Sequence, residues 1–453
     1  MATPPTRVPW GRRLVAAPWL LVFVPASAAT SAFGVALPLL ILFTLHSGVV
    51  EVALATTLYN SALIPAAFLW GVVCDRLQLR APLVLLNYLG FSMVFLVLAL
   101  TLSLPTLLLA YAAYGLVAPS SAAASNLLIL ERFPPEHRPM AFSSFQELST
   151  LGGVAGILIG FTWVILHPEP SALPGLLYLT LGLALASALG VVLFVHDPPR
   201  RLTRQAILRH PESLVSRLFT SIPFFPHRPA PGFWARASRW LRQEATHEIP
   251  LILVAVFLFN TASNLFNTSY VPYLQAIGLT SAAIFLVNLS NNSAQVMVYP
   301  FSGPACQRDG GERAVVGATG VRAIGYAATG LLAILPLVWL SGGAALGANL
   351  VIFGVLGGAI ALYGTASSLL LFRSMQRQRA GGLLGFNSAL GGLAAVLGSA
   401  ASGVVSVHFG FAVTFLLSLG VMAVSVPIWV AARKAWKTRH PKGAQETFYP
   451  SGP

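Results

Sequence analysis

The chain has 453 residues, of which 56% are hydrophobic and only 9% charged, and its formal net charge is +14. So few charged residues exclude a soluble globular protein, which needs far more charge to stay in solution. The apolar runs are long and continuous, which excludes a β-barrel, whose strands show about ten residues of alternating hydrophobicity.

Twelve apolar segments are long enough to cross a membrane. A helix needs about 20 apolar residues to span a hydrocarbon core of about 30 Å, and it bonds its own backbone amides. We therefore predict an all-α membrane protein. In chain order, the predicted spans are residues 17–43, 50–73, 82–101, 105–130, 140–166, 173–195, 249–275, 281–301, 314–338, 343–372, 381–407 and 411–431.

The first segment has a second interpretation. Arg12 and Arg13 precede the apolar run, and Ala26-Ser27-Ala28 resembles the cleavage site of a signal peptide. We favour a membrane span because the run continues to Phe43, which is too long for a signal peptide, and because it has a counterpart in the second half.

The basic residues follow the positive-inside rule, which gives the predicted orientation. With both termini cytoplasmic, 26 of the 27 Lys and Arg residues fall in cytoplasmic loops and tails, and none falls in an external loop. The remaining one, Arg322, lies inside the span 314–338. This placement excludes nucleic acid as the partner and predicts a multi-pass inner-membrane protein in contact with lipids. Cys74 and Cys306 are both predicted to be cytoplasmic, so we expect no disulfide.

An internal repeat indicates two halves of six spans. Gly71-Val72-Val73-Cys74-Asp75-Arg76 and Gly303-Pro304-Ala305-Cys306-Gln307-Arg308 match in Gly, Cys and Arg at an offset of 232 residues. Parallel repeats place a substrate site near the midplane, where the halves face each other. The predicted parts are an N-terminal half (1–195), a basic linker (196–248), a C-terminal half (249–431) and a cytoplasmic tail (432–453).

The linker contains a segment with two distinct helical faces. One face carries Phe233, Trp234, Ala237, Trp240 and Leu241, and the other carries Arg236, Arg239 and Arg242. This pattern is typical of a helix that lies in the lipid headgroup layer. A flexible tether is the equal alternative.

Three loop motifs resemble those of the major facilitator superfamily, whose signature loop reads G-x-x-x-D-R-x-G-R-R. They are Gly71-x-x-x-Asp75-Arg76-x-Gln78-x-Arg80, its degenerate copy Gly303-x-x-x-Gln307-Arg308-x-Gly310, and Glu131-Arg132-Phe133-Pro134-Pro135-Glu136-His137-Arg138. The resemblance covers nearly the whole chain and implies a transporter with twelve helices in two pseudo-symmetric halves. Drug–proton antiporters of the family carry an Arg where this chain has Tyr111, and a Gly-Pro pair that its fifth span lacks. Both departures argue against proton-coupled drug export.

The resemblance also implies a cytoplasmic gate. Asp75 is expected to meet the start of the eleventh span and nearby arginines when the cytoplasmic side is closed. A carboxylate is favoured at a helix N-terminus and beside Arg. The alternative is that the gate residues are ordinary solvated charges at the interface. The full predicted set is Asp75, Arg76, Glu131, Arg132, Arg138 and Arg308.

Two charged residues fall inside predicted spans. Glu147 is a candidate proton carrier, because an acid within a span is costly and often functional. It lies only about two turns from the cytoplasm, so pairing with Arg132 or Arg138 is the alternative. Arg322 is also about two turns into its span, and we expect it to snorkel to the cytoplasmic headgroups.

Polar side chains form stripes along the seventh and eighth spans. Amides that face lipid are expensive, so each stripe must face protein or a water-filled cavity. We predict that they line the substrate cavity, with Asn264 and Asn291 nearest its centre; hydrogen bonding between helices is the alternative. The predicted lining is Asn260, Asn264, Asn267, Asn288, Asn291, Asn292 and Gln295, with Ser31, Asn126 and Tyr363 added from other spans.

Amides both donate and accept hydrogen bonds, which suits uncharged hydroxylated or amide-bearing solutes. No charge is predicted near the middle of the cavity, so we expect a small neutral polar or amphiphilic solute carried by alternating access. A proton-coupled exporter of lipids, amphiphiles or drugs is the alternative. No phosphate loop or nucleophile–base pair is present, so a membrane enzyme or a receptor-like protein is disfavoured. We expect a monomer without cofactor or metal.

Overall fold

The computed structural model describes residues 18–77, 80–132, 138–197, 248–309, 311–334, 342–374 and 380–439. Among these residues the elements are helices, and no strand occurs. The N-terminal segment before Pro18, nearly all of the linker and the end of the C-terminal tail lie outside this part. The headgroup-helix hypothesis, on residues 233–242, is therefore not addressed by the structure, whereas Ala26-Ser27-Ala28 of the cleavage-site alternative lies inside the continuous helix Phe23–Leu39.

The helices reproduce the predicted spans closely. A short 3-10 turn (η1, Pro18–Val22) leads into the first span, and a π-helical turn (η2, Leu40–Thr44) ends it. The helices are α2 (Phe23–Leu39), α3 (Val49–Leu77), α4 (Ala81–Leu100), α5 (Leu104–Val117), α6 (Pro119–Arg132), α7 (Arg138–Leu166), α8 (Gly175–Phe194), α12 (Glu248–Ala276), α13 (Ser281–Asp309), α14 (Glu312–Ile334), α15 (Gly342–Ser374) and α16 (Ala380–Arg439).

The described helices are consistent with twelve spans, although not all twelve are recognised by their apolar composition. Among the described residues, ten helices are long and apolar enough to cross a membrane. One of these is α16, which contains a break at Gly410, with φ 84° and ψ 167°, and so holds the eleventh and twelfth spans. The amide-rich α13 is not among the ten, although its 29 residues are long enough to span the core.

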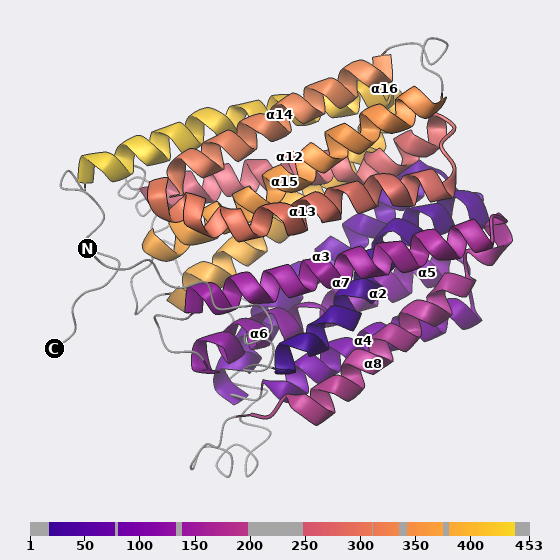
Figure 1. Cartoon of the computed structure of the whole chain (residues 1–453), viewed down its shortest axis with the longest axis horizontal. Coiled ribbons are helices and arrows are strands. Elements are labelled where there is room, and N and C mark those ends of the chain that lie inside the picture. Colours follow the sequence, from indigo (N-terminus) through magenta and orange to yellow (C-terminus); the bar gives the residue numbers. More distant parts are fainter. Residues whose placement is uncertain are drawn as a thin grey trace, which may run out of the picture.

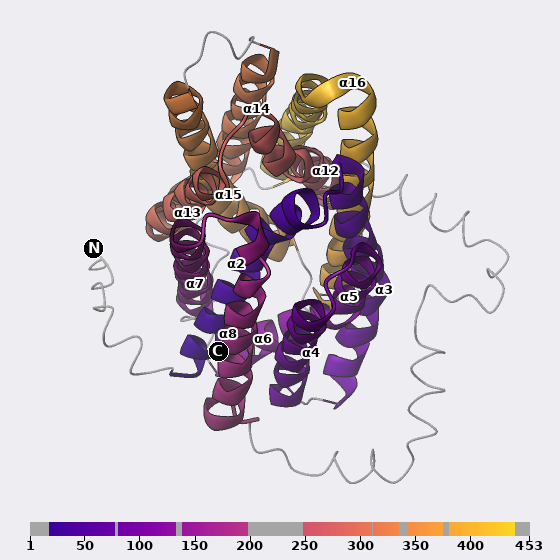
Figure 2. The ribbon, with the colours of Figure 1, turned by 90° about the vertical axis from the view of Figure 1, so that its right-hand side faces the viewer.

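Two bundles pack side by side. Helices α2–α8 form one, and α12–α16 form the other (Figure 1). The bundles meet along two helix pairs, α3 with α16 and α7 with α13 (Figure 2). Small residues lie at these crossings. A Cβ on Gly403 would lie 2.5 Å from Ala53 Cβ, and the hydroxyls of Thr57 and Ser399 are 2.9 Å apart.

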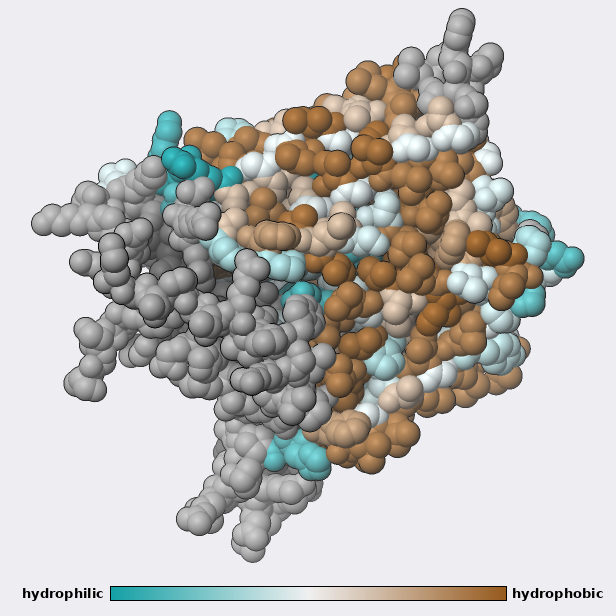
Figure 3. Space-filling view, in the orientation of Figure 1, coloured by the Kyte–Doolittle hydropathy of each residue, from teal (hydrophilic) through white to brown (hydrophobic). Residues whose placement is uncertain are grey.

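The side of the molecule is apolar between two polar ends. Figure 3 shows brown, hydrophobic side chains over the middle of the helices and hydrophilic ones toward the ends. Large apolar side chains face outward there, including Met93, Leu109 and Met297. Such a surface is stable only against lipid. The described part is therefore an all-α, multi-pass membrane protein.

Candidate functional site

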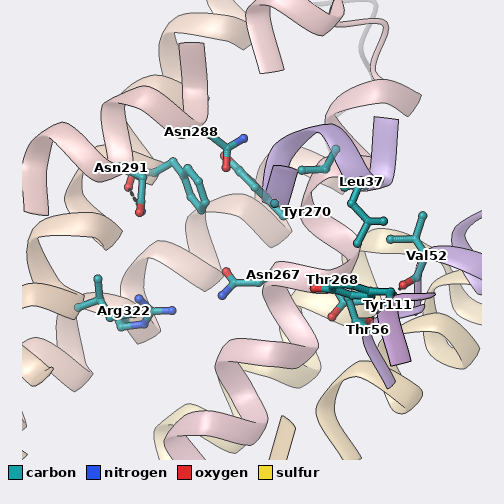
Figure 4. A pocket seen from close by; sticks show the side chains of 15 residues that line it. Leu37, Val52, Thr56, Tyr111, Asn267, Thr268, Tyr270, Asn288, Asn291 and Arg322 are labelled. Carbon is teal, nitrogen blue, oxygen red and sulfur yellow. Dashed lines mark hydrogen bonds between the residues drawn. The ribbon is translucent and has the colours of Figure 1, made fainter. Parts of the chain in front are cut away.

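A cavity of about 260 Å³ lies between the two bundles. Helices α2, α3 and α5 supply one side of its wall, and α12, α13, α14 and α15 supply the other. Figure 4 shows Thr56 and Tyr111 on the side opposite Arg322, with Asn267 between them. The polar groups of the wall are Thr56, Tyr111, Asn267, Thr268, Tyr270, Asn288, Asn291 and Arg322. The cavity lies between the halves, which is where the 6+6 organisation predicts a substrate site.

Asn267 is the amide of the two stripes that is most open to the cavity. It lies in the interior of α12, yet its side chain is exposed. It makes no side-chain hydrogen bond within the described part of the chain, so both its donor and its acceptor remain available. Neighbouring Asn288 also lines the cavity, but its Nδ2 donates to the Ile284 carbonyl of its own helix at 2.9 Å. Its Oδ1 is left to accept.

Asn291 has a double role. Its side chain lines the cavity, but its Nδ2 donates to the Phe353 carbonyl of α15 at 2.8 Å. Its Oδ1 accepts from Gln295 Nε2 at 2.8 Å. The two helices approach this closely because Gly357 faces the Asn291 backbone, where a Cβ would collide with the carbonyl. Asn291 therefore joins α13 to α15 as well as facing the cavity, whereas Gln295 does not line the cavity and supports Asn291 from the same helix.

Other predicted lining residues lie away from this cavity. Asn260 and Asn264 donate to carbonyls one turn earlier in α12, at 3.0 and 2.9 Å. Tyr363 is 6% exposed and stacks on Phe259, with ring centroids 3.4 Å apart. The choice of Asn264 as a central contact is not supported, because Asn264 packs near Gly398 of α16. The Asn126 side chain lies outside the described residues.

Ser31 and Asn292 meet at a crossing of three helices. A Cβ on Gly153 of α7 would lie 2.8 Å from Ser31 Oγ and 3.3 Å from Asn292 Oδ1. Asn292 Nδ2 donates to the Asn288 carbonyl at 3.2 Å. Both side chains are close to the boundary between the bundles, but neither lines the cavity described above.

The expectation that Arg322 snorkels to the headgroups is wrong. The side chain is 2% exposed and lines the cavity. It is held there by hydrogen bonds rather than drawn to the surface. Its Nε and Nη2 donate to the Tyr326 hydroxyl at 3.2 and 2.5 Å, and Nη2 also donates to Ser263 Oγ at 3.3 Å. The cavity wall therefore contains a positive charge. The sequence-based argument for a neutral solute assumed that no charge lies near the middle of the cavity, so that argument no longer applies.

Comparison with known proteins fits this architecture. The model of the Major Facilitator Superfamily matches residues 19–348, well over half of the chain. The chain belongs to the Major Facilitator Superfamily. No curated protein sequence matches it.

Two solved structures share the fold of this superfamily member. A crystal structure of a mutant of the nucleoside transporter NupG has a TM-score of 0.63 and 14% identity, covering 92% of this chain and 99% of the other. A crystal structure of the human organic anion transporter MFSD10 (TETRAN) has a TM-score of 0.59 and 16% identity, covering 93% and 100%. At this identity the likeness shows the fold alone.

The superfamily signature loop is only partly described. The side chains of the predicted gate residues Asp75, Arg76, Glu131, Arg132, Arg138 and Arg308 lie outside the described residues. The structure gives contacts for Arg80, which belongs to the quoted motif but had no predicted role, and for Asp197, which sequence reasoning did not single out. Arg80 Nη1 donates to the Cys74 carbonyl at the end of α3 and to Cys74 Sγ, the latter at 3.1 Å. Asp197 Oδ1 accepts from the backbone amides of Arg80 and Ala81, both at 2.9 Å, and so caps α4.

Glu147, the predicted proton carrier, is buried within α7 at 7% exposure. It lies nine residues after Arg138, the first residue of α7, and it does not line the cavity. Any proton that it carried would therefore be bound at a place separate from the solute. Its predicted partners, Arg132 and Arg138, are among the side chains that the structure does not describe.

Proposed function

We propose that this superfamily member carries a small polar or amphiphilic solute across the membrane by alternating access. The observation that supports this proposal best is the cavity between the bundles. Its wall contains the exposed amide of Asn267, which makes no side-chain hydrogen bond within the described part of the chain. Apolar residues such as Val52 and Val271 share the wall, which favours a solute with one apolar face. We further propose an inner-membrane location, with both termini and the linker in the cytoplasm, and a monomeric carrier.

The names of the two structural neighbours do not choose the solute. One transports nucleosides, which are neutral, and the other transports organic anions. Both chemistries fit a cavity that has amides and hydroxyls on its wall. A proton-coupled exporter of amphiphiles is the second candidate, and burial of Glu147 in α7 is the observation that favours it.

Counterflow tests the proposal. Purified protein in proteoliposomes is preloaded with a mixture of ribonucleosides, monosaccharides, uronates and amino acid amides. Uptake of each labelled solute from dilute external solution is then compared with uptake by protein-free vesicles. We expect accelerated exchange of at least one solute, and its loss in Asn267→Trp, which fills the cavity. Leu109→Trp is the control, because Leu109 is 72% exposed on the outer surface.

Two results would contradict transport through this cavity. One is the same exchange with and without protein for every solute in the mixture. The other is exchange that Asn267→Trp leaves intact at equal protein content, since a filled cavity cannot bind solute.

The cytoplasmic gate is proposed because Asp75 lies in the signature loop of the superfamily. We propose that Asp75 forms a charge-assisted contact only when the cytoplasmic side is closed, which makes the contact part of the transport cycle. Asp75→Asn is expected to slow exchange at unchanged protein level in the membrane. Asp197→Asn is the control, because Asp197 caps α4 at the same end of the bundle without belonging to the proposed gate. Equal exchange rates for Asp75→Asn and wild type would reduce Asp75 to a surface charge.

A further inference from the structure

Arg322 carries a permanent charge at the middle of its helix. It lies ten residues after Glu312, the first residue of α14. That distance corresponds to about 15 Å of helix, or half of the hydrocarbon core of about 30 Å. A guanidinium cannot lose its proton under ordinary conditions, so the charge persists although the side chain is 2% exposed.

The partners of this charge are all neutral. They are the Tyr326 hydroxyl, the Ser263 hydroxyl and the Leu356 carbonyl, which accepts from Nη1 at 3.3 Å. The rings of Phe259 and Tyr326 lie 5.2 and 5.3 Å from the guanidinium carbon. No carboxylate of the described residues forms an ion pair with it. By contrast, Arg433 of α16 pairs with Glu312 at 3.5 Å.

Neutral dipoles and ring faces orient a guanidinium, but they leave its net charge in place. A buried charge without a counter-charge is destabilising unless a partner of opposite sign is supplied. Packing of α14 against α12 and α15 needs no cation here, because a neutral donor would satisfy the same hydroxyls and carbonyl. The uncompensated charge therefore indicates a ligand that brings a negative charge into the cavity.

The geometry leaves a donor for that ligand. Nη1 carries two protons and makes one hydrogen bond, to Leu356, so one proton has no acceptor among the described residues. Figure 4 shows the guanidinium and the Asn267 amide pointing toward one another. Tyr326 also donates to Ser263 Oγ at 3.3 Å, which holds both acceptors of Nη2 in place. The guanidinium is thus fixed before any ligand arrives.

We propose that the cavity binds small organic monoanions, with a carboxylate-type group against Arg322 Nη1 and the Asn267 amide as a second donor. That the bound anion is the transported solute rests on the proposed transport function, but its binding can be measured without transport. The remainder of the solute would contact the Tyr111 and Thr56 side of the cavity, which is opposite Arg322 in Figure 4.

Matched pairs of solutes test the charge directly. Protein in lipid nanodiscs is heated with glucuronate or glucuronamide, nicotinate or nicotinamide, and hexanoate or hexanamide, which differ within each pair chiefly in charge. We expect at least one carboxylate to raise the melting temperature of the wild type more than its amide does. Arg322→Gln should abolish that preference and weaken carboxylate binding roughly ten- to hundredfold, as loss of a hydrogen bond to a charged group implies.

Two further variants separate recognition from folding. Arg322→Lys keeps the charge but loses the planar fork, so the preference for carboxylate should survive at lower affinity. Arg433→Gln removes an arginine that pairs with Glu312 outside the cavity, and its ligand preference should match that of the wild type. If Arg322→Gln does not fold, the wild type and Arg322→Lys still decide the question.

The proposal is overturned if no carboxylate stabilises the wild type beyond its amide, or if a folded Arg322→Gln keeps the preference. These results would leave transport standing, provided that counterflow detects exchange of a neutral solute. Conversely, carboxylate binding that depends on Arg322 without any counterflow would uphold the anion site and refute the transport function.

Discussion

At the scale of single residues, the amides of the bundle divide into those that join helices and those that remain available. Asn349 is 1% exposed and accepts from the Tyr270 hydroxyl at 3.0 Å, so it links α15 to α12. Asn267 is exposed in the cavity without such a bond. Both are asparagines within a span, and only the neighbouring helix distinguishes them.

This division predicts opposite effects for two alanine substitutions. Asn267→Ala should leave thermal stability within about 0.5 kcal/mol of wild type and weaken solute binding by about 1 kcal/mol, a factor of roughly five. Asn349→Ala should destabilise by about 1–3 kcal/mol, because it leaves the buried Tyr270 hydroxyl without an acceptor. Melting curves and binding isotherms check both. Loss of stability without loss of affinity in Asn267→Ala would make Asn267 a packing residue.

Glu147 offers a test of proton coupling. If Glu147 carries the proton, Glu147→Gln should abolish uphill accumulation driven by a pH gradient, yet leave counterflow, which needs no net proton movement. Glu51→Gln is the matched control, since Glu51 lies at the start of α3 and accepts from the Gly48 amide at 2.8 Å. Accumulation that continues in Glu147→Gln would show that the proton takes another route or that transport is uncoupled.

The amide stripes can be recognised in the sequence, but which of their members line the cavity, and the role of Arg322, could not be predicted from it. A single arginine within a span has the same local sequence signature whether its side chain extends to the headgroups or folds inward. The difference depends on Tyr326, Ser263 and Leu356, which come from three helices. Asp197 was missed for a similar reason, because it caps α4 from 116 residues away.

At the scale of elements, hydropathy located the spans, and local backbone chemistry modified them. The predicted fourth span is divided into α5 and α6 at Ala118. Pro119 follows directly, and proline removes a backbone donor and crowds the preceding turn. The break at Gly410 agrees with the predicted gap between 407 and 411, since a positive φ is a conformation that glycine adopts readily.

Glycines in α7 allow close approach to α2. A Cβ on Gly156 would collide with the Ala28 carbonyl, whereas one on Gly182 of α8 would meet nothing within 4 Å. Gly156→Ala should therefore destabilise the protein by about 1–3 kcal/mol through overpacking. Gly182→Ala should be neutral or slightly stabilising, because alanine is the better helix former. Equal melting temperatures for the two variants would show that α2 can shift away from α7 without cost.

At the scale of the whole molecule, the repeat in the sequence anticipated an architecture in which two bundles enclose a site. The described contacts between the bundles run mainly along two helix pairs, α3 with α16 and α7 with α13, and include close approaches at glycines. Thr57 and Ser399 supply one hydrogen bond there, at 2.9 Å. Contacts of this kind can be broken and remade as the bundles rock, which alternating access requires.

Accessibility of position 267 from each side of the membrane tests alternating access most directly. Asn267→Cys is placed in a background lacking Cys74 and Cys306, and a membrane-impermeant thiol reagent is applied to right-side-out and inverted vesicles. A cysteine at His167, in the loop predicted to be external, reports vesicle orientation. Alternating access predicts modification of position 267 from both sides, slowed by a solute that exchanges in counterflow. Modification from only one side under every condition would contradict it.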